Sequence, residues 1–98
     1  MKHFIVFIHY KVPVEQLGGA VKDHRDFLQS GYERGWLLMS GPRNPITGGI
    51  VVARAPSQAD LVDFFADDPY KSAGLANHEY LEFDPVKYQP WLADWIAG

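Results

Sequence analysis

The chain has no cysteine, which excludes disulfide bonds, thiolate metal sites and a cysteine nucleophile. It has no apolar run long enough to span a membrane. The N-terminal residues lack a small-residue cleavage site, so we interpret them as a strand and not as a signal peptide, and expect a cytoplasmic protein. No basic cluster is present, and the formal net charge is -3. These features argue against a nucleic-acid partner.

What the chain does contain is typical of one folded domain. It has 98 residues, of which 47% are hydrophobic and 21% charged, a balance that favours a soluble globular fold. Aromatic residues make up 14%, which is rich for this size and indicates buried aromatic surface or an interface. We therefore predict a single domain over residues 1–98.

Short runs of β-branched and aromatic residues, bounded by glycine or proline, predict four strands at 4–10, 36–40, 50–55 and 77–83. A helix is predicted over 14–34, where apolar residues recur at steps of three and four. Gly18 and Gly19 weaken its first turns, so its start is expected to be late or distorted. A second helix follows the N-cap Ser57 and cannot continue through Pro69.

The order of these elements is β-α-β-β-α-β, followed by a helical tail that contains Trp91 and Trp95. This order predicts an α+β, ferredoxin-like antiparallel sheet with helices on one face. We place the core in residues 3–85 and a C-terminal extension in 86–98. The other face of the sheet carries apolar residues and needs cover, either from the C-terminal helix or from a second subunit. We expect a homodimer.

His24 is the first candidate for chemistry, because it lies on the apolar stripe of the 14–34 helix. A lone histidine in that position is usually a core or helix-edge residue with one ring nitrogen bonded to a neighbour. The alternative is a general base, since imidazole titrates near neutral pH.

Asp68 is the second candidate. It follows the last turn of a helix, where the macrodipole disfavours an anion. Asp68 and Pro69 form a good N-cap and N1 pair, so Asp68 could cap a short helical turn over 69–73 that Gly74 closes. An aspartate can also orient a histidine by holding one ring nitrogen. The two roles are compatible if one oxygen caps while the other orients.

Other polar residues are weaker candidates. We expect contacts with a substrate from His9, Arg43, His78 and Tyr70. Three histidines with acids nearby raise the question of zinc, but no close-set motif such as His-Glu-x-x-His is present, and we expect no metal. No Gly-x-Ser-x-Gly nucleophile motif surrounds any serine. Trp91 and Trp95 are interpreted as packing or interface residues, with a lid over a pocket as the alternative.

Three segments of the sequence resemble the YCII-related family over about residues 3–85. One contains His24, within 23–28; the second is 34–42, which ends in Gly-Pro; the third is 67–75, with its Asp-Pro-aromatic and Ala-Gly pattern. The resemblance implies a ferredoxin-like fold assembled as a dimer of the α/β-barrel kind, and it matches His24 and Asp68 to the family's proposed His-Asp pair. The C-terminal segment with Pro90 and the tryptophans departs from the shorter members.

The activities assigned within that family include dehydrochlorination of chlorinated hydroxyhydroquinones during aromatic degradation. The resemblance thus implies a cofactor-independent lyase or isomerase-like enzyme that moves protons on a cyclic or aromatic small molecule, with His24 as base and Asp68 as its orienting partner. The alternative is a non-catalytic small-molecule-binding or dimerisation module. An enzyme requires His24 and Asp68 within hydrogen-bonding reach beside a pocket, whereas a binding module requires only the pocket.

Overall fold

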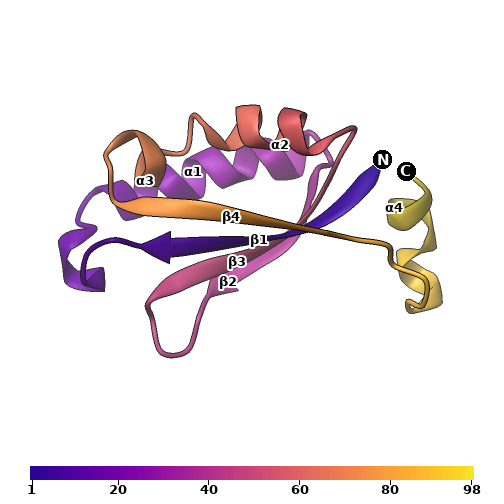
Figure 1. Cartoon of the computed structure of the whole chain (residues 1–98), viewed down its shortest axis with the longest axis horizontal. Helices are drawn as coiled ribbons and strands as arrows, with labels where there is room; N and C mark the ends of the chain where they lie inside the picture. Colours follow the sequence, from indigo (N-terminus) through magenta and orange to yellow (C-terminus); the bar gives the residue numbers. More distant parts are fainter.

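The computed structural model describes residues 1–98 and contains one four-stranded sheet (Figure 1). Its strands are β1 (Lys2–Tyr10), β2 (Leu37–Pro42), β3 (Gly48–Ala55) and β4 (Ala76–Phe83). They lie in the order β2-β3-β1-β4, and every neighbouring pair is antiparallel. Both strands that flank β1 are far from it in sequence, so the sheet is held by long-range pairing.

The two longer connections place three helices over one face of this sheet (Figure 1): α1 (Ala20–Glu33) follows β1, and α2 (Gln58–Phe65) and α3 (Pro69–Ser72) follow β3. The predicted ferredoxin-like α+β arrangement is therefore confirmed. Ser57 caps α2 as expected, since its hydroxyl accepts the N–H of Asp60 at 3.1 Å. No helix is both long enough and apolar enough to cross a membrane.

The core lies between the helices and the covered face of the sheet. Alternate residues of β1 face it, and they are buried together with side chains of β3 and α2: Phe4, Val6, Ile8, Val51, Ala53, Leu61 and Phe65. Helix α1 approaches the sheet closely at Gly31, where a Cβ would overlap the Leu37 side chain and the Phe64 ring. This close packing brings the buried side of α1, including His24, down onto the sheet.

The first helix differs from the predicted continuous span over 14–34. A short 3-10 turn, η1 (Val14–Gln16), comes first, and α1 begins only at Ala20. The interruption falls at Gly18, whose φ of 55° is in the left-handed region that glycine tolerates. The late start expected from the two glycines is thus confirmed, and the prediction of one helix from Val14 was wrong. The turn folds Val14 and Leu17 back over the end of the sheet, where they line a pocket.

The opposite face of the sheet is left open by the helices. Strand alternation and register place Ile5 and Phe7 of β1 on it, opposite Leu81 of β4 and Ile50 of β3. Met39 is 59% exposed and Leu81 48% exposed. We refer to Ile5, Phe7, Met39, Ile50, Val52, Leu81 and Phe83 as the open apolar face.

The C-terminal residues form η2 (Pro90–Leu92) and α4 (Ala93–Ala97), which lie beyond one end of the sheet (Figure 1). The Trp95 ring packs against His3, with 5.5 Å between ring centroids. Arg54 Nη1 donates a hydrogen bond to the Trp95 carbonyl oxygen at 2.7 Å. The interpretation of Trp95 as a packing residue is confirmed, and α4 leaves much of the open apolar face without cover.

Candidate active site

A fully buried carboxylate is the centre of the site. Asp68 follows α2 and forms the N-cap of α3, where its Oδ1 accepts the N–H of Tyr70 at 3.0 Å. Pro69 occupies the first helical position, and Gly74, with a φ of 71°, ends the turn. The predicted capping role is therefore confirmed, and it fixes the carboxylate on the covered side of the sheet.

Two histidines from other elements bind the same carboxylate. His24 of α1 has its Nδ1 at 2.8 Å from Asp68 Oδ1, and His78 of β4 has its Nε2 at 2.9 Å from Oδ2. The contact predicted between His24 and Asp68 exists. One expectation was wrong: the oxygen that caps α3 is also the one that meets His24, and the second oxygen is taken by His78.

These contacts decide the charge of Asp68. Burial alone would raise the pKa of the carboxyl, but the hydrogen bonds of His24 and His78, the charge of His24 and the Tyr70 N–H lower that pKa to about 2. Asp68 is thus an anion at neutral pH and can only accept hydrogen bonds. The contacting nitrogens must then be N–H donors, so a neutral His24 carries its proton on Nδ1 and has a free lone pair on Nε2.

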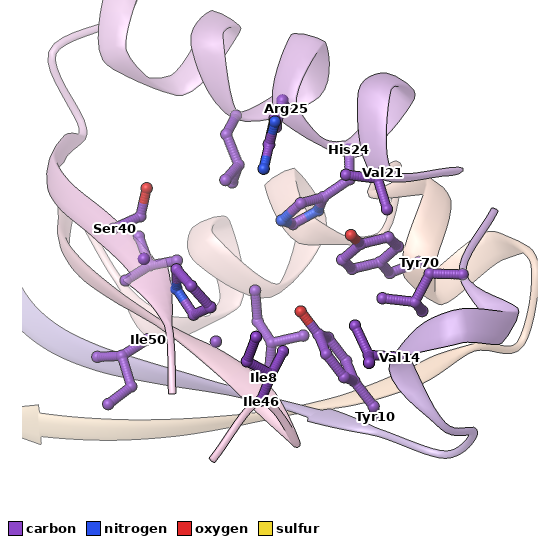
Figure 2. A pocket seen from close by; sticks show the side chains of 16 residues that line it. Ile8, Tyr10, Val14, Val21, His24, Arg25, Ser40, Ile46, Ile50 and Tyr70 are labelled. Atoms are coloured by element: carbon purple, nitrogen blue, oxygen red, sulfur yellow. The ribbon is translucent and has the colours of Figure 1, made fainter. Parts of the chain in front are cut away.

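His24 lies at the wall of a pocket of about 360 Å³ between α1, η1 and the ends of β1, β2 and β3 (Figure 2). The imidazole stacks on the Tyr70 ring, with 3.9 Å between centroids and 9° between planes. Its Nε2 has no hydrogen-bonding partner in the chain. Most of the lining is apolar; the polar side chains are those of Tyr10, His24, Arg25, Ser40 and Tyr70.

The two tyrosines contribute hydroxyl groups to this pocket (Figure 2). Their rings meet edge to face, with centroids 5.7 Å apart. Burial, together with the neighbouring Tyr10, raises the pKa of Tyr70 to about 12. Burial also raises the pKa of Tyr10 above its usual value. Both hydroxyls therefore stay protonated at neutral pH and can donate to an oxygen of a ligand.

The structure does not bring every predicted residue to the pocket. His9 lies on the open side of β1, where its Nε2 meets Glu79 Oε1 at 2.8 Å. Arg43 is exposed in the β2–β3 connection and does not line the pocket. The side chain of His78 is buried and reaches the site only through Asp68; its Nδ1 has no partner. The structure therefore gives no support to substrate contacts from these three residues, whereas Tyr70 does line the pocket.

Three polar lining residues, Tyr10, Arg25 and Ser40, were not anticipated as ligand contacts. Tyr10 ends β1 on the helix-facing side, and Arg25 follows His24 in α1. The alternation of β1 carried a signal for Tyr10, because it shares a side with the core residues Val6 and Ile8. Arg25 stands at the edge of the apolar stripe, four residues after Val21 and three before Leu28, but a charged residue in that position is usually only solvated, so the sequence did not single it out.

The fold and site define a small α+β domain in which two helices and an edge strand converge on one buried carboxylate beside a pocket. The model of the YCII-related domain matches residues 1–84, so the chain belongs to the YCII-related family. No curated protein sequence matches it. Among solved structures, it is similar to 5-chloro-2-hydroxyhydroquinone dehydrochlorinase (TftG) from Burkholderia phenoliruptrix, in complex with 2,5-dihydroxybenzoquinone. The TM-score is 0.62 at 15% identity, over 88% of this chain and 93% of that chain, a likeness that shows the fold.

The lowered pKa of Asp68 predicts a specific loss of stability in acid. Because the folded pKa, about 2, lies below the ordinary value of 3.8, the unfolded chain takes up the proton first as the pH falls. The contribution of Asp68 is present above pH 4 and lost towards pH 2, and is about 2 kcal/mol. Urea unfolding of Asp68→Asn should lack this part of the acid dependence. Asp67→Asn, an exposed neighbour, is the control; an identical acid profile for Asp68→Asn and the native chain would contradict the assignment.

If His78 holds the buried carboxylate of Asp68, loss of this contact should cost more stability than loss of the exposed contact between His9 and Glu79. His78→Leu leaves Asp68 Oδ2 buried without a donor, and should lower the free energy of unfolding by about 1–3 kcal/mol. His9→Leu breaks a contact in which both side chains are exposed, and should change stability little. Denaturant unfolding of both variants at neutral pH makes the comparison. Equal losses would mean that His78 does not hold the carboxylate.

Proposed function

We propose that this protein is a small cofactor-independent enzyme that transfers protons on a cyclic or aromatic small molecule. The observation that carries the proposal is the His24–Asp68 contact of 2.8 Å, with His24 at the wall of the pocket. Asp68 holds the imidazole in one tautomer and stabilises the imidazolium that forms, which leaves Nε2 to act on the ligand. At about 360 Å³ the pocket suits a small ring, since ligand pockets range from about 300 to 1,000 Å³.

The most concrete form of this activity is dehydrochlorination of a chlorinated hydroxyhydroquinone, a lyase reaction in aromatic degradation. His24 Nε2 takes the proton of a ring hydroxyl and returns a proton to the adjacent carbon that bears chlorine, so the hydroxyl becomes a carbonyl. Removal of the proton from the hydroxyl opposite that carbonyl then forms a second C=O bond. The electron pair shifts through the ring C=C bond and expels chloride. The net change is loss of HCl and formation of a hydroxyquinone.

The chain's own residues supply the rest of the chemistry. Proton transfer by a positioned side chain contributes about 10²–10⁴-fold. The hydroxyls of Tyr10 and Tyr70 are placed to donate to ring oxygens on which negative charge develops. The likeness to a dehydrochlorinase whose structure holds a dihydroxybenzoquinone supports a flat, oxygenated ring as the ligand.

The proposal predicts that His24→Ala abolishes turnover while the fold persists. Chloride release from a chlorinated hydroxyhydroquinone should fall by about 10²-fold or more, because the base is lost. His9→Ala changes a histidine on the open face of the sheet, away from the pocket, and should keep the native rate. Circular dichroism and unfolding midpoints check the fold of both variants. Full activity in His24→Ala would contradict the mechanism and leave the alternative of a binding module.

We further propose that the enzyme works as a homodimer through the open apolar face. A monomer would leave Met39, Leu81 and Phe83 in water, at 59%, 48% and 42% exposure. These residues belong to one side of one sheet, and a second copy of the same side is self-complementary about a two-fold axis. α4 lies at the end of the sheet and leaves room for such packing.

The dimer proposal predicts that Leu81→Lys dissociates the protein, because two lysines would be buried in the apolar interface. Val86→Lys is the matched control: Val86 is 85% exposed but lies outside the sheet. Sedimentation velocity should give a dimer for the native chain and for Val86→Lys, and a monomer for Leu81→Lys. A monomeric native chain would contradict the proposal.

A further inference from the structure

Arg25 is a positive charge at the pocket that no other residue neutralises. It stands next to His24 in α1, and its side chain lines the pocket (Figure 2). The other basic residues of this region are engaged elsewhere: Lys22 Nζ of α1 meets Asp26 at 2.8 Å, and Arg34, which follows α1, lies over the Trp36 ring at 4.7 Å. The guanidinium of Arg25 forms no ion pair or hydrogen bond with another side chain.

The pocket also contains no carboxylate that could attract a cation. Asp68 is sealed behind His24, and both of its oxygens are bound. The positive charge of Arg25 also acts on the two tyrosines. Burial raises the pKa of Tyr10 and of Tyr70, and Arg25 opposes this by lowering both pKa values. The site thus combines one free guanidinium, two protonated hydroxyls and an apolar floor. Arg25 is exposed, so water solvates its guanidinium in the empty pocket, and an anionic ligand gains a charge-assisted hydrogen bond there that an uncharged ring does not.

We infer that the ligand of this pocket is a planar oxygenated ring bound as an anion, with the negative oxygen at Arg25 and its other oxygens at the hydroxyls of Tyr10 and Tyr70. The inference rests on the proposed function for the identity of the site and adds the charge of the ligand. A chlorinated hydroxyhydroquinone that has already lost one hydroxyl proton to solvent is such an anion. It releases only chloride when it becomes the hydroxyquinone, because the proton of the net HCl has left beforehand.

Binding of two probes tests the inference. The first is 2,5-dihydroxybenzoquinone, a vinylogous acid that is anionic at neutral pH. The second is its dimethyl ether, which has the same ring but no charge. Isothermal titration calorimetry at neutral pH and low salt compares the native chain with Arg25→Gln and Arg25→Lys. Lys22→Gln removes the same charge from an exposed position of the same helix that does not line the pocket, and is the matched control.

The expected result is that Arg25→Gln binds the anionic probe about tenfold more weakly or worse, since a charge-assisted hydrogen bond is lost. Arg25→Lys should retain part of the affinity, Lys22→Gln all of it, and the dimethyl ether should bind weakly and equally to every variant. Equal affinity of Arg25→Gln and the native chain for the anion would overturn the inference. So would an equal loss in Lys22→Gln, a preference for the ether, or no binding of either probe by the native chain.

The two proposals fail separately. If the anion binds through Arg25 but His24→Ala keeps its full turnover, the mechanism falls and the inference about charge stands. If His24→Ala is inactive while Arg25→Gln binds the anion at native affinity, the mechanism stands and the inference falls.

Discussion

The structure depends on one buried charge. A carboxylate without partners inside a protein costs far more than a small domain can supply, so Asp68 requires its donors. Three elements provide them: the backbone of α3 through Tyr70, α1 through His24 and β4 through His78. Satisfying Asp68 therefore fixes where α1 lies against the sheet and where α3 turns back into β4. The same requirement orients the imidazole that meets the pocket.

Much of the fold was predictable from short-range pattern. The four strands, the second helix and the turn after Asp68 followed from apolar runs and from cap and breaker residues. The element order then predicted the sheet topology. The ends of the strands did not follow, because Gly48, Gly49 and Pro42 extend the β2–β3 hairpin through pairing that only the assembled sheet supplies. The break at Gly18 depended on a left-handed backbone that the residue allows but does not require.

The sequence predicted the central pair of the site, His24 and Asp68, but not the residues around that pair. His24 and Asp68 stood out because each was placed against its local preference, on an apolar stripe and at a helix end. His78 was expected to touch a ligand, yet strand alternation turns its side chain towards Asp68 on the covered side of the sheet. His9 was also expected to touch a ligand. It precedes Tyr10 in β1, so strand alternation turns its side chain to the opposite side of the sheet from the pocket. Arg25 could be recognised as a candidate only once the structure showed the pocket, because in the sequence it is an ordinary charged residue of a helix surface.

The central claim is that Asp68 fixes His24 with its proton on Nδ1 and leaves Nε2 free to act as a base. Long-range ¹H–¹⁵N NMR of the histidine side chains, recorded above the pH at which the imidazoles lose their charge, measures this directly. The account predicts the Nδ1–H tautomer for His24 in the native chain, and a shift towards a mixture of tautomers in Asp68→Ala. An Nε2–H tautomer for His24 in the native chain would contradict it.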